Sequence, residues 1–248
     1  MELLAGYSAL QIVVAVLATF ASAFVRGLAG FGMAILLVPV LALALSPVEA
    51  VLIINFLALF IGASELRMFL AHAEKSAWII GGLVLLATAP GLMVLAATPP
   101  DIARLLIAIV ALSAFALVLL PTRSPEVPGP LVTGAAGITS GLLTGFAGMP
   151  GPPVVPYYVG RQIPRQVAKA SMLLIFTLAA LAGLGSGAAI GLLQWHLLWL
   201  ALMLFPVVLL GNWLGSKAFG KVSDTVWRGF TGFVLGAAAL AALVKLLN

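Results

Sequence analysis

Apolar segments of about 20 residues, almost free of charge, follow one another along nearly the whole chain. A helix needs about 20 apolar residues to cross the hydrocarbon core of a bilayer. Only 8% of the 248 residues are charged and 63% are hydrophobic, whereas a soluble domain carries about 25% charged residues. The segments also lack the alternating pattern of an outer-membrane barrel. The sequence therefore predicts an all-α integral membrane protein.

Ten hydrophobic elements can be counted in the chain. We expect the first to be retained as a membrane span, because Glu2 and no Lys or Arg precedes it, whereas a signal peptide begins with a basic region. The elements are expected at approximately 8–26, 31–45, 48–68, 76–97, 102–120, 131–147, 151–160, 166–190, 195–216 and 226–247.

Several kinds of protein are excluded by residues that the sequence lacks. The formal charge of +5 is not concentrated in a basic run with aromatic residues, so nucleic acid is not an expected partner. The chain has no cysteine, and its two histidines, His72 and His196, are far apart, so we expect neither a metal site nor an iron–sulfur cluster. It has no nucleotide-binding fingerprint and no cluster of catalytic side chains. The sequence therefore predicts a protein that is not an enzyme and carries no cofactor.

Two hydrophobic segments, at 24–45 and 141–160, are interrupted by glycine and proline. The part at 151–160 is about half as long as the hydrocarbon core is thick, so it cannot cross alone as a helix. Non-helical backbone at membrane depth is tolerated only where protein or a water-filled cavity surrounds it. Interrupted segments at matching positions of two halves are typical of transporter binding sites. We therefore expect broken or re-entrant half-helices here.

The chain divides into two halves of similar pattern. We expect a first transmembrane repeat at 1–120, a linker at 121–130 and a second repeat at 131–248, because the linker is the hydrophilic, proline-rich stretch near the middle. Both halves contain a glycine turn, a short apolar segment, a helix that begins with proline and a helix that begins with tryptophan. At an offset of 117 residues, Pro39 falls on Pro156, Pro47 on Pro164 and Trp78 on Trp195.

Basic residues indicate how the elements are oriented. If all ten elements cross, ten Lys and Arg residues lie on one side and two, Arg104 and Lys245, on the other. If 31–45 and 151–160 dip in and return, the eight remaining spans give a split of 8 to 4. Because basic loops stay in the cytoplasm, the first count is favoured. Five elements in each half make the halves inverted, and both termini are then expected outside the cytoplasm.

The glycine turns have two properties that suit an anion. Glycine adopts backbone conformations that other residues avoid, so several N–H groups can point at one spot. A helix that begins there adds unpaired N–H donors and about half a positive charge. Half-helices that begin near Gly32 and Gly151 could aim their N-termini at a common site in the middle of the membrane. The alternative is that these glycines only allow helices to pack closely.

These segments resemble those of the TauE/SafE family of sulfite and organosulfonate exporters, also called the TSUP family. Its members carry two repeats, each with a glycine-rich turn that runs into an apolar segment and a proline. Residues 27–39 match the first copy and residues 140–153 the second, and the segment order matches over nearly the whole chain. Gly32-Met33-Ala34 stands where the family often has three glycines. The resemblance implies transport of small sulfur-containing anions such as sulfite, sulfoacetate or other organosulfonates.

Twelve residues at the turns and in the helices between them are predicted to bind the substrate. Asn55 and Ser171 could donate to a substrate oxygen, or could form hydrogen bonds between helices. Arg26 could pair with an oxyanion, or could anchor the chain at the headgroups. Glu65 is the candidate for proton coupling. The predicted binding set is Arg26, Gly30, Phe31, Gly32, Met33, Asn55, Thr144, Gly148, Met149, Pro150, Gly151 and Ser171.

The sequence thus favours a secondary transporter, an exporter that works by alternating access around a midplane anion site. A passive anion channel and a membrane assembly subunit without a substrate are the alternatives. We expect a multi-pass protein of the bacterial plasma membrane. Its expected partners are a small anionic substrate and the lipid bilayer, and a homodimer is possible.

Overall fold

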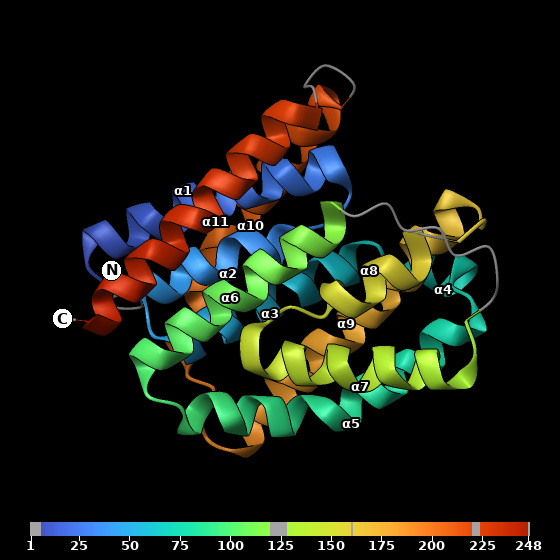
Figure 1. The fold of residues 1–248 in the computed structure, drawn as a ribbon, viewed down its shortest axis with the longest axis horizontal. Coiled ribbons are helices and arrows are strands. Elements are labelled where there is room, and N and C mark those ends of the chain that lie inside the picture. The colour runs from blue at the N-terminus through green and yellow to red at the C-terminus, as the bar shows by residue number, and fades with distance from the viewer. Residues whose placement is uncertain (1–5, 120–127, 160, 220–223, 248) are drawn as a thin grey trace.

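A computed structural model describes residues 6–119, 128–159, 161–219 and 224–247 (Figure 1). These residues form eleven α-helices, and none of them lies in a strand, so the predicted all-α architecture is confirmed. The helices are α1 (Ala9–Ala29), α2 (Met33–Ala44), α3 (Pro47–Ser64), α4 (Leu66–His72), α5 (Lys75–Ala97), α6 (Pro100–Leu119), α7 (Pro130–Ala147), α8 (Gly151–Val159), α9 (Arg165–Ala189), α10 (Trp195–Ala218) and α11 (Asp224–Leu247).

Eight of these helices are long and apolar enough to cross a bilayer, namely α1, α3, α5, α6, α7, α9, α10 and α11. The chain is therefore a multi-pass membrane protein. Helices α2 and α8 have 12 and 9 residues and follow the two glycine turns. Each is shorter than the hydrocarbon core, which is about 30 Å thick, because a helix rises by about 1.5 Å per residue. They are the broken half-helices expected from the sequence. Most of the predicted linker at 121–130 lies outside the described residues.

The predicted element at 48–68 is wrong at its C-terminal end. Helix α3 ends at Ser64, and Glu65 leaves the helical conformation with φ −111° and ψ 17°. The apolar residues continue beyond it into α4, a seven-residue helix that the sequence does not predict. Hydropathy cannot detect this break, because Met68 and Phe69 continue the apolar run.

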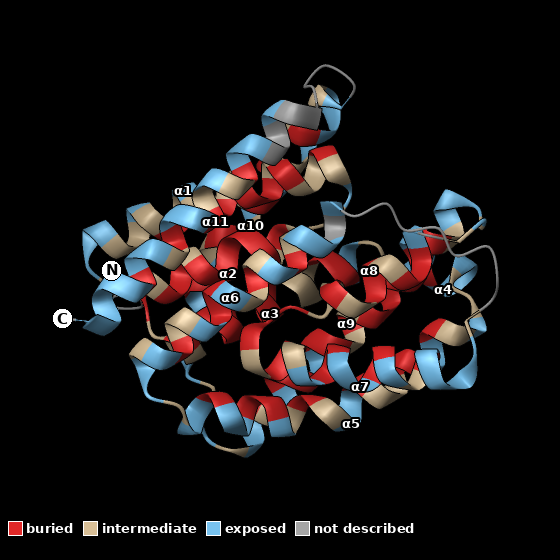
Figure 2. Ribbon diagram, viewed as in Figure 1, coloured by how far each residue is buried: buried red, intermediate tan, exposed pale blue. Residues whose placement is uncertain are grey.

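Helices α3 and α9 pack against each other in the interior of the bundle, where most of their residues are buried (Figure 2). The contact is close because glycine on each helix faces a polar side chain on the other. A methyl group on Gly62 would overlap with Thr177, and a methyl group on Gly183 would overlap with Asn55. Polar side chains in a membrane interior are commonly held at such helix interfaces.

Helices of the first half also pack closely on helices of the second. Helix α1 packs on α10, where a methyl group on Gly27 would overlap with the backbone of Asn212. Helix α7 packs on α5, where a methyl group on Gly145 would overlap with the backbone of Thr88. Small residues let helix backbones approach in this way. The two halves are therefore interlocked.

One end of the bundle is held together by two sets of polar contacts, one between the beginnings of α3 and α10 and one between the beginning of α6 and the end of α2. Ser46 and Glu49 form a reciprocal cap at the start of α3, and His196 Nε2 lies 3.3 Å from Glu49 Oε1. Arg104 Nε donates to the carbonyl of Ala42, at the end of α2, over 2.7 Å. Both labelled termini lie at this end, on the left of Figure 1. Helices α1 and α7 run in opposite directions across this view.

The opposite end carries most of the basic side chains. It is formed by the ends of α1, α3 and α10, by α4, and by the beginnings of α5, α7 and α9. Seven of the nine basic side chains that the structure describes lie there, and Arg104 and Lys245 lie at the first end. The seven are Arg26, Arg67, Lys75, Arg161, Arg165, Lys169 and Lys217.

Candidate anion-binding site

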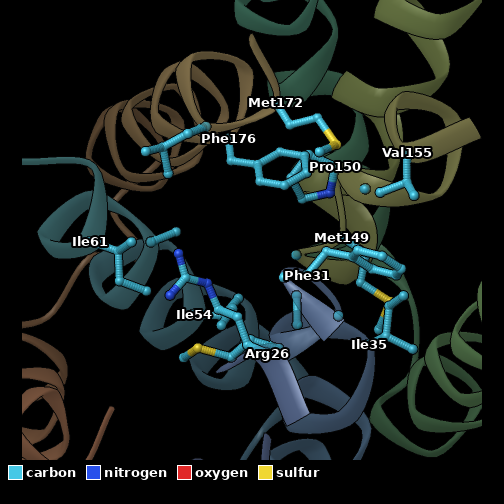
Figure 3. A pocket seen from close by; sticks show the side chains of 18 of the residues that line it. Arg26, Phe31, Ile35, Ile54, Ile61, Met149, Pro150, Val155, Met172 and Phe176 are labelled. Carbon is cyan, nitrogen blue, oxygen red and sulfur yellow. The ribbon is translucent and has the colours of Figure 1, made fainter. Parts of the chain in front are cut away.

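A cavity of about 110 Å³ lies where both glycine turns meet α3 and α9 (Figure 3). A site for one water molecule needs about 10–15 Å³ on this measure, so the cavity has room for a small anion. In Figure 3, Phe176, Met172 and Pro150 lie along one wall, and Phe31, Met149 and Ile35 along the facing wall. The cavity is therefore shaped by segments from both halves of the chain.

Ten of the twelve predicted binding residues line this cavity. The sequence pattern thus identified a set of residues that the fold brings together, although they come from positions more than 100 residues apart. The ten are Arg26, Gly30, Phe31, Gly32, Met33, Asn55, Gly148, Met149, Pro150 and Gly151. The assignment of these residues to substrate binding stays a prediction.

The first glycine turn depends on backbone conformations that favour glycine. Gly30 caps the C-terminus of α1 with φ 85°, and Gly32 precedes α2 with φ 95°. An L-residue in this left-handed region places its Cβ too close to the next carbonyl oxygen. Gly30 and Gly32 together reverse the direction of the chain between Ala29 and Met33, so that α2 begins beside the end of α1.

The N-terminus of α2 presents unpaired N–H groups to the cavity. The first backbone hydrogen bond of this turn of helix runs from Leu36 to Gly32, and no side chain caps the helix. The backbone N–H groups of Met33, Ala34 and Ile35 therefore have no acceptor among the described residues, and all three residues line the cavity. Unpaired donors and the positive end of the helix dipole together suit an anion.

The N-terminus of α8 contributes less than the sequence suggests. Gly148 caps α7 with φ 65°, so the second turn has the same left-handed glycine as the first. Helix α8, however, begins Gly151-Pro152-Pro153, and proline has no N–H to offer. Among Pro150 and the first three residues of α8, the positions whose N–H groups have no acceptor within the helix, only Gly151 carries an N–H. The two half-helices are therefore unequal, and α2 supplies most of the backbone donors.

Two cationic side chains reach the cavity. The Arg26 side chain is 15% exposed, and its Nη1 donates to Asn212 Oδ1 over 3.0 Å. Its other terminal nitrogen lies 3.6 Å from Glu65 Oε1. Arg26 lines the cavity and is largely buried, and its role as a ligand stays a prediction. Lys169, one turn into α9, is the second cation, and its Nζ lies 2.9 Å from Glu65 Oε2.

Lys169 is a charged residue that lines the cavity but is missing from the predicted binding set. From the sequence, Lys169 is interpreted as one of the basic residues that orient the chain, with a ligand role as the alternative because it lies beside Ser171. Its position just inside α9, four residues after the helix begins, is the signal that could have distinguished it. Glu65 does not line the cavity but pairs with both of its cations. The role of Glu65 in proton coupling stays a prediction.

Asn55 is buried on α3 and has an unused hydrogen-bonding capacity. Its side chain lines the cavity, and its Nδ2 is enclosed without a partner among the described residues. The nitrogen faces Gly183 of α9. A half-turn about the terminal torsion, which is roughly two-fold, would exchange oxygen and nitrogen and direct two donors at an anion. A buried amide nitrogen without a partner costs free energy, and the binding role of Asn55 stays a prediction.

The other two predicted binding residues lie away from the cavity. Thr144 is buried in α7, where its hydroxyl donates to the carbonyl of Ser140 over 2.7 Å. Ser171 is buried in α9, and its Oγ accepts from the backbone N–H of Glu74 over 3.0 Å. Both hydroxyls therefore have partners within the protein. For Ser171 the structure favours the interhelical hydrogen bond that the sequence left open.

A second polar network ties the end of α8 to the loop before α5. Arg161 Nη1 lies 2.5 Å from Glu74 Oε1, and its guanidinium stacks within 5.8 Å of the ring centre of Tyr158. Ser76 donates to Glu74 and lies 2.8 Å from the Tyr158 hydroxyl. The hydrogen bond to Glu74 raises the pKa of the Arg161 guanidinium. This network fixes the far end of α8 and leaves its N-terminus at the cavity.

The His and acidic side chains of the structure are spread over both ends of the bundle. Among the described residues, no three His, Cys, Asp or Glu side chains come together in a way that could hold an ion. His72 and His196 lie at opposite ends of the bundle, with Gln166 and Glu49 as their respective neighbours.

Eight helices long and apolar enough to span a membrane, two short half-helices and a cavity between the two halves define a polytopic membrane protein with a candidate binding site. The chain matches the family model described as sulfite exporter TauE/SafE over residues 14–242. The protein therefore belongs to the sulfite exporter TauE/SafE family. No curated protein and no solved structure matches the chain significantly.

Proposed function

We propose that the protein is a secondary transporter that exports small sulfur-containing anions, such as sulfite or organosulfonates, across the bacterial plasma membrane. One observation carries this proposal. The cavity between the two halves collects two cationic side chains, the unpaired Asn55 amide and the free N–H groups of α2. A sulfite or sulfonate group has three acceptor oxygens, which these donors could bind together.

The distribution of charge supports an orientation with the termini outside. Seven of the nine described basic side chains lie at the end of the bundle opposite the termini. Under the positive-inside rule, that end faces the cytoplasm. The cation pair of the cavity lies at the same end, and the side chain of Lys169 is 56% exposed. An anion would therefore enter the site from the cytoplasm, as export requires.

The architecture supports alternating access. Helices α1 and α7 lead into equivalent glycine turns and run in opposite directions, as expected for inverted repeats. Rocking of one repeat against the other would expose the cavity between them to either side in turn. An inside-negative potential would drive an anion outward by about 2.3 kcal/mol per charge per 100 mV. Export could then proceed without a coupled ion.

Counterflow in proteoliposomes tests this function. Vesicles loaded with unlabelled sulfite are diluted into labelled sulfite, and a transporter should accumulate label transiently and saturably. A passive anion channel, the first alternative, would give conductance and no counterflow. A membrane assembly subunit would give neither, and that result would overturn the proposed function. A homodimer stays a possible form of the transporter.

A further inference from the structure

We propose that Glu65 determines the charge of the anion that the cavity accepts, so that the site selects monoanions over dianions. This inference rests on the proposed function, because it concerns the selectivity of the same site. Glu65 lies at the junction of α3 and α4, and its carboxylate bridges the two cations of the cavity. Oε1 lies 3.6 Å from Arg26 Nη2, and Oε2 lies 2.9 Å from Lys169 Nζ.

The three groups leave one net positive charge at the cavity. Arg26 and Lys169 contribute two positive charges, and Glu65 removes one. Other charged side chains at this end do not change the count. Glu74 and Arg161 neutralise each other across 2.5 Å and do not line the cavity. Arg67, Lys75, Arg165 and Lys217 do not line the cavity, and their exposed side chains are screened by salt.

Because the rest of the cavity lining is apolar, the net charge of these three groups determines which anions can be bound. Apart from Arg26, Lys169 and Asn55, the cavity is lined by apolar residues and glycine. Such surroundings stabilise an ion poorly, so an uncompensated charge is costly. A monoanion leaves the site neutral, whereas a dianion leaves one negative charge in an apolar enclosure. Hydrogensulfite and alkanesulfonates therefore fit, whereas the sulfite dianion and sulfoacetate fit poorly.

Removal of the charge of Glu65 should weaken or abolish this preference. Glu65→Gln keeps the size of the side chain and removes its charge, which leaves two positive charges at the cavity. A dianion would then be compensated, and a monoanion would leave one cation unpaired.

Calorimetric titration of the purified full-length protein at constant ionic strength measures the effect, with methanesulfonate as the monoanion and sulfate as the dianion. We expect wild-type protein to bind methanesulfonate at least about tenfold more tightly than sulfate. Glu65→Gln should lower this ratio by about tenfold or more.

Three further variants separate charge from shape. Glu65→Asp keeps the charge and should keep the preference for methanesulfonate. The double variant Glu65→Gln/Lys169→Gln has Arg26 as its one cation, so the net charge returns to that of wild type and the preference should return with it. Glu74→Gln makes the same chemical change on a carboxylate outside the cavity and should leave the ratio unaltered.

Each outcome bears on one proposal. An unchanged ratio in Glu65→Gln, or a double variant that keeps the altered ratio, would overturn the assignment of selectivity to the charge of Glu65. If Glu65→Gln does not fold, the comparison moves to Lys169→Gln, which lowers the net charge by one and should weaken sulfate binding more than methanesulfonate binding. An equal loss for both anions would overturn the inference. Wild-type protein that binds neither anion would instead overturn the proposed function.

Discussion

Backbone conformation distinguishes glycines that the two turns require from one that they do not. Gly30, Gly32 and Gly148 all have positive φ angles, which L-residues rarely adopt. Gly151 does not, and a methyl group there would meet Phe176 and Val155 at an ordinary distance of 3.8 Å. The sequence could predict that glycine matters at these turns, but the four glycines look alike until their φ angles are known.

Alanine should therefore lower the stability of the protein at one cavity-lining glycine, Gly32, and leave it unchanged at another, Gly151. Gly32→Ala places a Cβ in the left-handed region, which costs roughly 1–2 kcal/mol. Gly151→Ala should be tolerated, because its site has space and an ordinary φ. Thermal unfolding in detergent checks this prediction, with a lower Tm expected for Gly32→Ala alone. Equal Tm values for the two variants would contradict the conformational argument.

Asn55 should contribute to binding and not to stability. Its enclosed Nδ2 has no partner among the described residues, so a leucine of similar size would remove a buried polar group without breaking a hydrogen bond. We expect Asn55→Leu to leave Tm unchanged or raise it, while anion affinity falls by about tenfold, the equivalent of one hydrogen bond to a charged group. A fall in Tm with unaltered affinity would show that Asn55 has a structural role.

The polar candidates show what sequence reasoning cannot settle for single residues. Asn55, Thr144 and Ser171 all lie within apolar segments and look equally suited to a ligand. Only the fold reveals that Thr144 donates to its own helix and that Ser171 accepts from Glu74, whereas Asn55 faces the cavity. Which face of a buried helix meets a cavity depends on its neighbours, because all faces of such a helix are apolar.

At the scale of elements, close helix crossings depend on glycines whose neighbours are backbone atoms. A methyl group on Gly145 of α7 would overlap with the backbone of α5 at Thr88 and Leu92. At Gly134, on the same helix, a Cβ would meet no atom within 4 Å apart from the neighbouring backbone of its own helix. The two residues therefore form a matched pair.

Gly145→Ala should destabilise the protein by about 1–3 kcal/mol, because backbone atoms cannot move aside at little cost. Gly134→Ala should be neutral or stabilising by up to about 1 kcal/mol, because alanine favours a helix. Thermal unfolding of both variants in the same detergent measures the difference. A Gly145→Ala variant as stable as wild type would mean that α5 and α7 do not approach as closely as described.

Hydropathy predicts the long helices well because each of them must contain about 20 apolar residues. It places eight of them within a few residues of their observed bounds. It cannot find the break at Glu65, since a short helix at the end of a span adds no hydropathy signal of its own. That break determines where the Glu65 carboxylate lies, and it therefore shapes the candidate site.

For the whole molecule, the two ends of the bundle should face different compartments. Gln194 precedes α10 at the end that carries the termini, and Gln162 precedes α9 at the basic end; both are exposed. The chain has no native cysteine, so a single introduced thiol reports its own side of the membrane. A membrane-impermeant thiol reagent should label Gln194→Cys in intact cells and Gln162→Cys only after permeabilisation. The reverse pattern would overturn the proposed orientation and, with it, entry of the anion from the cytoplasm.

The presence of a site between two halves could be predicted from paired glycine turns, because interrupted segments in matching positions of two repeats usually meet. The arrangement of charged side chains at that site could not be predicted. The pairing of Glu65 with Arg26 and Lys169 joins three elements that are far apart in sequence. Only the packing of α1 on α10, of α10 on α3 and of α3 on α9 brings those charges together.

Protection of a cysteine inside the cavity tests the central claim most directly. Ala58 of α3 lines the cavity, whereas Ala71 of α4 is exposed near the same end of the bundle and does not line it. Thiol labelling of Ala58→Cys should slow in the presence of methanesulfonate or ethanesulfonate, both monoanions, and labelling of Ala71→Cys should not. A rate for Ala58→Cys that neither anion alters at saturating concentration would contradict the assignment of this cavity as the anion site.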